Sequence, residues 1–537
     1  MSGPDRKEVT RITPAHVVKK IFDLGVSRPI ASENLDSFEV HYFDLTPAKI
    51  RISHFTRLLF SRKAVRNPQL SEDEIEELVV QAEQIASQSA RARLEKSDDE
   101  NSMILVQEGQ LPPSVLASRS LPSHPGCVIL DKSDCRSILD SAHRSDALRI
   151  LARACARAFG PLQLSPYVMG SPAIGYRFFG RQALLKRISA RANTSITLIG
   201  TRRIGKTSLL HELKRQFTIR YPEVLVAHLY GSNLDTAHEV LSRIIEDTLH
   251  AARVARIQVD KLMEKELGNE LRKVIERGRH RVAIFIDEID HILDWDEKQD
   301  FRLLNFFREL SYSEYCTFYF AGYRSTLKAV EDVNNPLYNF TSAERILPFQ
   351  RHETFEMVEH PLENLGLPVT VAGLADLIHR ESGGQPELIQ YMCNKVLEIY
   401  SGTNEVITPE QLSAQLTIDP KFESTIFRQF AQNIPKRTLL SVLLFLRSRG
   451  DSLDTSDFHF TATDLAKAVQ EKSVDYGVHT TPEHVRDLAA DLELAGVITR
   501  TGIRAPITYR FTVPRLGDYY VVMGIENEIK RLVAEEA

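Results

Sequence analysis

The chain has 537 residues, of which 43% are hydrophobic, enough for two to four globular domains. Its 67 Lys and Arg against 72 Asp and Glu leave a net charge of −5, so no global basic surplus favours non-specific binding to nucleic acid. The five cysteines are scattered and lack a C-x-x-C pair, which indicates a reducing compartment and argues against a zinc site. The polar N-terminus predicts no signal peptide, and no apolar run approaches the ~18 residues of a transmembrane helix. We therefore expect a cytoplasmic protein that does not enter a membrane.

Residues 1–160 are predicted to form a separate unit with an α+β or α/β fold. Strands are expected at 38–43, 103–107 and 127–130. Ser71 and Glu74 form a capping-box pattern at the start of a helix that runs towards Arg93 and dissolves in the polar run 95–101. Helical stretches then carry the chain to about Phe159.

Residues 161–176 are predicted to be a linker because prolines and glycines recur there: Pro161, Pro166, Gly170, Pro172 and Gly175. Residues 177–350 then alternate strand and helix, as a parallel sheet with crossover helices requires. We expect its strands at 195–199, 224–230, 282–286, 317–321 and 345–348.

The stretch Gly200-Thr201-Arg202-Arg203-Ile204-Gly205-Lys206-Thr207 fits the phosphate-binding loop pattern G-x-x-x-x-G-K-[ST]. An apolar strand precedes it and a helix follows from Ser208, which is the context that this motif needs. The glycines let backbone N–H groups curl around phosphates, and the helix N-terminus adds its partial positive charge. Lys206 can reach the β- and γ-phosphates, and the Thr207 hydroxyl can ligate Mg²⁺. We therefore predict that residues 200–208 bind ATP, rather than forming a Gly-rich turn without a nucleotide.

A second motif supports this interpretation. The continuous apolar run 282–286 is typical of a strand buried on both faces, and it ends in Asp287-Glu288. In a P-loop ATPase, Asp287 would hold Mg²⁺ and Glu288 would polarise the attacking water. The alternative is a buried strand followed by a solvated acidic turn, which the upstream P-loop disfavours.

The octet G-x-R-R-x-G-K-T followed by Ser-Leu-Leu resembles the archaeal-type and related ATPases of the STAND class, which are akin to AAA+ and origin-recognition ATPases. Phe179-Gly180-Arg181 resembles the F-G-R-E box of this group, which packs beside the adenine, although Gln182 replaces the acid. Gly384-Gln385-Pro386 resembles the G-x-P motif of the helical lid, whose proline contacts the base or senses nucleotide state. The resemblance covers about 165–515 and implies a lid over 351–433.

The resemblance also implies two further site residues. The strand 317–321 is followed by Tyr323 and Arg324, where such ATPases place a polar sensor of the γ-phosphate. We expect Arg324 to be catalytic in this sense, against the alternative of a solvated arginine in a surface loop. Arg345 stands where AAA+ relatives place an arginine finger that acts in trans, although STAND proteins often lack one.

Residues 434–537 resemble a winged helix. The second helix is expected near 462–470, the recognition-type helix near 482–494 and the wing strands at 497–500 and 507–512. The candidate recognition helix is acidic, and carboxylates repel DNA phosphates. The wing carries three arginines, Arg500, Arg504 and Arg510, so contact with DNA remains an alternative. We favour a lid or dimer contact over DNA recognition.

An effector such as a nuclease is one candidate role for residues 1–160. A restriction-type nuclease needs an E-x-K or D-x-K triplet on a strand, and residues 30–130 contain none. Asp5-Arg6-Lys7 fits the letters but lies in a polar terminus. We favour a sensor, an adaptor or a degenerate enzyme fold.

These observations predict an ATP-binding and ATP-hydrolysing switch in signalling, defence or transcription. One alternative is a DNA-acting loader or initiator, and another is an adaptor that holds nucleotide with little turnover. The expected ligands are ATP or ADP and Mg²⁺, and the expected partner is another protein or a second copy of the chain.

Overall fold

The structure is a computed structural model. It describes residues 20, 28–35, 38–44, 56–61, 71–88, 103–106, 112–119, 127–162, 164–191, 193–251, 262–277, 281–312, 316–365, 367, 373–403, 407–417, 419, 421–422, 434–449, 458–501, 506–514, 516 and 524–536. The chain divides into two compact units. The first contains residues up to Val168 together with Glu356–Leu374 and Met392–Leu412, and the second contains the remainder. Asp5–Lys7, the polar run 95–101 and Arg504 lie outside the described residues.

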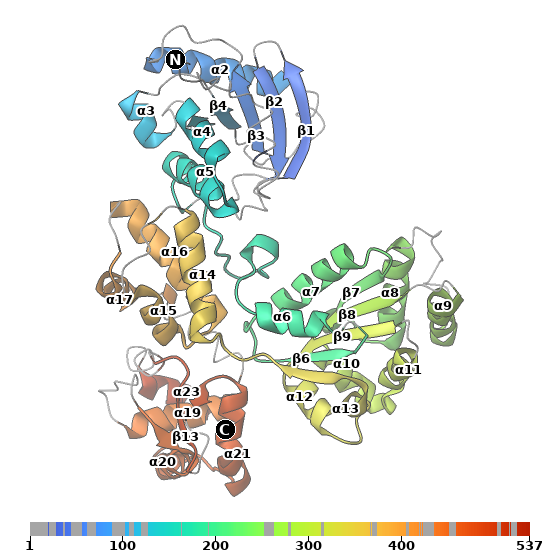
Figure 1. The fold of residues 1–537 in the computed structure, drawn as a ribbon. Helices are drawn as coiled ribbons and strands as arrows, with labels where there is room; N and C mark the ends of the chain where they lie inside the picture. The colour runs from blue at the N-terminus through green and yellow to red at the C-terminus, as the bar shows by residue number, and fades with distance from the viewer. Residues whose placement is uncertain are drawn as a thin grey trace, which may run out of the picture. The chain divides into compact units, whose positions relative to one another are not determined.

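The first unit contains a mixed five-stranded sheet in the order β1-β2-β3-β4-β5 (Figure 1). Its strands are β1 (Arg28–Leu35), β2 (Phe38–Asp44), β3 (Thr56–Ser61), β4 (Met103–Val106) and β5 (Cys127–Leu130). The first three pair antiparallel, whereas β3, β4 and β5 pair parallel. The predicted strands at 38–43, 103–107 and 127–130 are confirmed, while β1 and β3 were not anticipated.

Helices α2 (Glu72–Gln88), α3 (Pro113–Ser118), α4 (Lys132–Asp140) and α5 (Arg144–Phe159) accompany this sheet. The predicted capping box of α2 is present, because Ser71 N donates to Glu74 Oε2 over 2.8 Å and Glu74 N donates to Ser71 Oγ over 3.2 Å. These reciprocal bonds satisfy two backbone donors at the helix start, which is why the helix begins there.

The second unit is built on a parallel five-stranded sheet in the order β10-β6-β9-β8-β7. Its strands are β6 (Ile196–Ile199), β7 (Leu225–Tyr230), β8 (Val282–Asp287), β9 (Cys316–Gly322) and β10 (Ser342–Arg345). All neighbouring pairs run parallel. The predicted α/β parallel-sheet fold is therefore confirmed, and four of its five strands lie where the sequence placed them.

The fifth strand was predicted at 345–348 and this position is wrong, because β10 begins at Ser342 and ends at Arg345. The apolar pair Ile346 and Leu347 caused the error. Ile346 is buried and its N–H donates to Ile199 O over 2.7 Å, but Leu347 is 64% exposed and lies beyond the ladder. The strand itself has an alternating, half-buried pattern that a continuous apolar run does not reveal.

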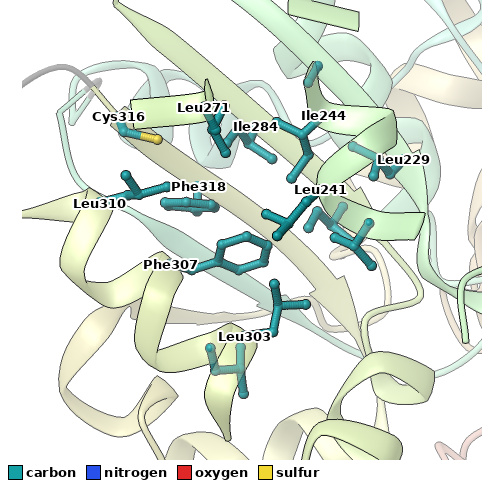
Figure 2. Packing of buried hydrophobic residues seen from close by; sticks show 14 of the residues in the cluster. Leu229, Leu241, Ile244, Leu271, Ile284, Leu303, Phe307, Leu310, Cys316 and Phe318 are labelled. Carbon is teal, nitrogen blue, oxygen red and sulfur yellow. The ribbon is translucent and has the colours of Figure 1, made fainter. Parts of the chain in front are cut away.

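The two faces of the sheet are covered by different helices (Figure 1). On one face, α6 (Gln182–Ser189) and α7 (Lys206–Arg220) pack against Ala283, Phe285 and Tyr319. On the other, Ile284, Ile286 and Phe318 belong to one buried cluster with residues of α8 (Ala237–Ala251), α9 (Glu264–Arg277), α10 (Asp290–Asp296) and α11 (Arg302–Ser311). Figure 2 shows Ile284 and Phe318 in this cluster with residues of α8, α9 and α11. Successive strand residues thus point to opposite faces, which explains why β8 and β9 are apolar throughout.

The remaining described elements follow the sheet in chain order. They are α12 (Arg324–Glu331), α13 (Leu337–Phe340), α14 (Arg351–Asn364), α15 (Leu374–Ser382), α16 (Pro386–Thr403), α17 (Pro409–Thr417), α19 (Lys436–Ser448), α20 (Ala462–Asp475), α21 (Pro482–Leu494) and α23 (Ile525–Glu536). Strands β11 (Phe460–Thr461), β13 (Thr508–Phe511) and β12 (Ile498–Arg500) form an antiparallel sheet in that spatial order. Short 3-10 turns occur at Gly175–Arg177, Gly231–Asn233 and Glu297–Gln299.

Candidate nucleotide site

The phosphate-binding loop connects the carboxyl end of β6 to the amino end of α7. Arg203 (φ 62°) and Gly205 (φ 99°) both adopt left-handed backbone, which curls the loop. Gly200 is needed for space, since a Cβ there would lie 2.9 Å from Ile346 O and 2.9 Å from Ile204 Cγ2. The loop therefore ends at a helix N-terminus whose unpaired N–H groups favour an anion.

Lys206 lies inside this loop. Its Nζ donates to Gly200 O and to Thr201 O, each over 2.8 Å. Burial lowers its pKa to about 8, opposed by the negative charges of Asp287, Asp290 and Glu288. The side chain therefore carries its positive charge at pH 7, against the carbonyls of the phosphate-binding loop.

Asp287 is the last residue of β8 and is 1% exposed. Its carboxylate accepts hydrogen bonds from the Thr207 side chain and from Glu288 N, the latter over 2.9 Å. Burial raises the pKa of this carboxyl, against the lowering effect of Thr207, Glu288 N and Lys206. A buried carboxylate beside a threonine hydroxyl is a set of oxygen donors that suits Mg²⁺, so the residues fit the predicted metal.

Glu288 is exposed and has a left-handed backbone (φ 53°), which is uncommon for a residue with a side chain. Gly231, directly after β7, stabilises this turn by its lack of a side chain, because a Cβ there would lie 2.6 Å from Glu288 O. The turn directly follows Asp287, so Glu288 stands at the carboxyl end of β8 with an exposed side chain. Nothing in the sequence pattern singled out Gly231.

The predicted sensor residues follow β9. Asp290 accepts from Tyr323 N over 2.7 Å and from Thr326 N over 3.0 Å, and so fixes the start of α12. The Tyr323 ring lies 6.0 Å from Lys206 Nζ, and Arg324 Cζ lies 5.4 Å from the same ring. Arg324 also approaches Asp491 of α21, with 3.8 Å between Nη1 and Oδ1. Asp290 was not predicted, although it lies only three residues after Asp287, close to the acidic motif that the sequence did identify.

The F-G-R box lies beside the loop and is mostly buried. Phe179 is 4% exposed, and Gly180 is needed because a Cβ there would lie 2.9 Å from the Phe349 ring. Arg181 donates to Leu347 O over 2.5 Å and to Ile204 O over 3.4 Å. Burial lowers its pKa to about 10. Arg181 thus connects Ile204 of the phosphate loop to Leu347, which follows β10.

Part of the predicted linker is attached to the P-loop helix. Ala173 N donates to Ser208 Oγ over 2.9 Å, and Gly175 N donates to Glu212 Oε2 over 3.2 Å. Glu212 is 3% exposed and also binds Arg215. The Ser208 side chain, predicted to contact nucleotide, therefore contacts this segment, while its backbone stays in the first turn of α7.

The G-x-P segment also meets the loop. Gly384 has φ 73° and lies against Phe349, whose N–H donates to Gly384 O over 2.7 Å. Pro386 is the first residue of α16, where the missing N–H of proline costs nothing. The next residue, Glu387, binds Arg203 Nη1 through both carboxylate oxygens, at 2.8 and 3.0 Å. Glu387 was not predicted, and it connects the start of α16 to the phosphate loop.

Two other predicted arginines are exposed. Arg202 lies on the phosphate loop, where its charge contributes to lowering the pKa of Lys206. Arg345, the candidate arginine finger, forms an ion pair with Glu331 at 2.7 Å, and the two side chains are 63% and 59% exposed. No role in the site of the same chain follows from that pair.

Residues 190–328 match the model of a family described as an AAA domain. This range contains the phosphate loop, the Asp287-Glu288 motif and the Tyr323-Arg324 turn. The segment is thus a P-loop ATPase domain of the AAA type, and the chain is a nucleotide-binding ATPase. A search of the curated proteins found no match.

Several solved structures are similar at low identity. The Walker-type ATPase of Pyrococcus abyssi is 13% identical, with a TM-score of 0.48 over 66% of this chain and 99% of that one. The Aeropyrum pernix ORC2 protein is 14% identical, with a TM-score of 0.46 over 66% of this chain and 93% of that one. The Aeropyrum pernix ORC1 protein in complex with DNA is 19% identical, with a TM-score of 0.35 over 67% and 95%. Similarities this weak do not assign a substrate or partner to this chain.

Proposed function

We propose that the chain is a STAND-like regulatory switch driven by ATP binding and hydrolysis. The observation that carries this proposal is the convergence of Lys206, Thr207 and Asp287 at the phosphate loop, with Glu288 at its edge. Thr207 and Asp287 would hold Mg²⁺, which when bound neutralises phosphate charge. Lys206 holds the β- and γ-phosphates in place of its present carbonyl partners.

Glu288 is the proposed general base. Its carboxylate takes a proton from a water whose oxygen attacks the γ-phosphorus, and the bond from that phosphorus to the β,γ-bridging oxygen breaks, giving ADP and phosphate. Exposure keeps the Glu288 carboxylate accessible to water, whereas Asp287 is buried and hydrogen-bonded. The two acids therefore have different tasks, set by their surroundings.

Residues 434–537 are proposed to be a winged helix that acts as a lid on this site. Helices α19, α20 and α21 with the sheet β11-β13-β12 support this assignment. Three contacts support the lid role. Gly496 packs against Thr201 of the phosphate loop, because a Cβ at Gly496 would lie 3.1 Å from Thr201 Cγ2. Thr512 packs against Gly383, because a Cβ at Gly383 would lie 1.9 Å from Thr512 O. Asp491 of α21 approaches Arg324 after β9.

Pro386→Ala should weaken the coupling between nucleotide and the α16 segment more than it destabilises the fold. Proline at the first helical position presets the backbone, and here it precedes the Glu387 that binds Arg203. Pro409→Ala is a matched control, because Pro409 also begins a helix, α17. Among the described residues, the phosphate loop makes no contact with Pro409. Limited proteolysis with and without ATP gives the readout. An ATP-dependent protection pattern that stays unchanged in Pro386→Ala would argue against this role.

A DNA-acting loader is the second candidate function, and the wing arginines Arg500 and Arg510 favour it. Against it, Arg500 binds Glu493 of α21 at 2.8 Å, and α21 carries the exposed acids Glu483 and Asp487. Such a helix brings carboxylates towards phosphates without releasing counterions. The observations therefore favour the lid.

We expect the full chain to bind duplex DNA in the non-specific range of roughly 10⁻⁴ to 10⁻⁶ M at physiological salt. Arg500→Ala and Arg510→Ala should leave that affinity unchanged, because the wing is not the reading surface. A mobility-shift titration at two salt concentrations checks this. Nanomolar, sequence-dependent binding that these variants lose would promote the DNA-acting function.

The cytoplasmic assignment and the partner belong to the same proposal. All five cysteines are buried thiols, none of them in a disulfide, which supports a reducing compartment. No helix among the residues placed in the structure is long and apolar enough to cross a membrane. The N-terminal unit would sense or pass on the signal to a protein partner or a second copy, and a pull-down with ATP or ADP present identifies which.

A further inference from the structure

A cluster of three titratable side chains, His211, His228 and Tyr230, lies on the β7 side of the Asp287-Glu288 turn. Tyr230 is the last residue of β7 and pairs in register with Asp287 on β8. Residues paired across parallel strands project to the same face of a sheet. Phe285 and Val226 pack with α7. Tyr230 lies four residues after Val226 on β7, and Asp287 lies two residues after Phe285 on β8, so both side chains also project to the α7 face.

The Tyr230 hydroxyl is held by the P-loop helix. His211 lies one helical turn after Thr207 on α7, and its Nε2 is 2.9 Å from Tyr230 Oη. The His228 ring packs edge-on against His211 with 4.6 Å between ring centroids, and it lies 5.1 Å from the Tyr230 ring. The hydroxyl thus has a fixed position, although the Tyr230 side chain is 42% exposed.

The charge state of the cluster suits a hydrogen-bond donor. Burial lowers the pKa of His228 to about 4 and lowers that of His211, which Lys214 lowers further. Burial and the charges of Asp287 and Glu288 raise the pKa of Tyr230. At pH 7 both imidazoles are therefore neutral and the phenol keeps its proton.

The backbone at this point is also tied to Glu288. Gly231 follows Tyr230, and a Cβ there would lie 2.6 Å from Glu288 O, so the end of β7 packs against the left-handed turn at Glu288. Tyr323 and Arg324 stand on the opposite side of β8, after β9. Tyr230 thus brings a hydroxyl to the acidic turn from the β7 side.

We propose that Tyr230 is a positioning residue for ATP hydrolysis, whose hydroxyl, held by His211, orients the Glu288 carboxylate and the water that it activates. This inference rests on the proposed role of Glu288 as the base. It assigns to the His211–Tyr230 pair a role in the rate of the chemical step and none in holding the nucleotide. Loss of one hydrogen bond to a charged group corresponds to about a tenfold change in rate.

The test is steady-state ATP hydrolysis by the full chain. Tyr230→Phe should lower kcat about tenfold and leave KM and the affinity for a fluorescent ATP analogue unchanged. His211→Ala should lower kcat by a similar factor, and His211→Gln, which can still bind the hydroxyl, should restore part of it. The double variant should be no slower than Tyr230→Phe alone, because the two residues act as one unit.

Tyr312→Phe is the matched control, since Tyr312 is 76% exposed at the end of α11, four residues before β9 begins. Thermal unfolding of each variant separates a loss of fold from a loss of rate, and His211→Gln keeps the test open if Tyr230→Phe is unstable. Wild-type kcat in a folded Tyr230→Phe variant overturns the inference. If Glu288→Gln is slow while Tyr230→Phe is not, this inference fails and the proposed function stands. If Glu288→Gln also keeps the wild-type rate, the assignment of Glu288 itself fails.

Discussion

Lys206→Ala is expected to abolish ATP binding. The variant removes the one side-chain cation held inside the phosphate loop of the described structure, where Lys206 Nζ lies 2.8 Å from Gly200 O and Thr201 O. Burial lowers the pKa of Lys206 to about 8, and a partly desolvated charge attracts phosphate more strongly than a solvated lysine does. Titration with a fluorescent ATP analogue measures the loss. Lys186→Ala, at an exposed lysine of α6, is the control and should bind as the wild type does.

The same pKa predicts a pH dependence. Below pH 8 Lys206 is charged before the nucleotide arrives, so binding takes up no proton at this group. Above pH 8 the free site has lost that proton and binding must restore it, which weakens affinity by up to about 1.4 kcal/mol per pH unit. Wild-type affinity should therefore fall between pH 8 and pH 9.5. Unchanged affinity in Lys206→Ala at pH 7 would overturn the ATPase site itself.

The nucleotide motifs were predictable because each depends on a short contiguous stretch. Gly205 and Lys206 lie in one loop, and Asp287 follows a strand whose burial on both faces requires an unbroken apolar run. The helix bounds 482–494 were also predictable, since Pro482 starts the helix and apolar residues recur along it at helical spacing. Local rules suffice where the feature is local.

The rest of the site depends on contacts between distant segments, which no local pattern records. Glu387 binds Arg203 across 184 positions of sequence, and Tyr230 meets His211 across 19. Gly231 is required only because the Glu288 carbonyl lies against it. Strand β10 was misplaced for a similar reason, because its half-buried edge position is a property of the whole sheet. Register and packing, not propensity, decide these features.

Glu288→Gln is expected to retain ATP but slow hydrolysis by about 10² or more, the usual scale for the loss of a general base. The amide has the size of the carboxyl group but cannot accept the proton of the attacking water. Glu288 is exposed, so the substitution removes no buried packing, and Gln can occupy the same left-handed turn. Phosphate release under saturating ATP measures the rate, and Glu297→Gln, at another exposed glutamate after α10, is the control.

Comparison with Asp287→Ala makes this result interpretable. Asp287 is 1% exposed and bonded to Thr207, so its loss removes a proposed metal ligand and should abolish hydrolysis through a different defect. Added Mg²⁺ should rescue Asp287→Ala in part and leave Glu288→Gln slow, because only the first variant lacks affinity for the ion. A Glu288→Gln variant at the wild-type rate beside an inactive Asp287→Ala would exclude Glu288 as the base. Absence of phosphate release by the wild type itself, with tight ATP binding retained, would instead identify an adaptor that holds nucleotide, because the same residues would then serve binding alone.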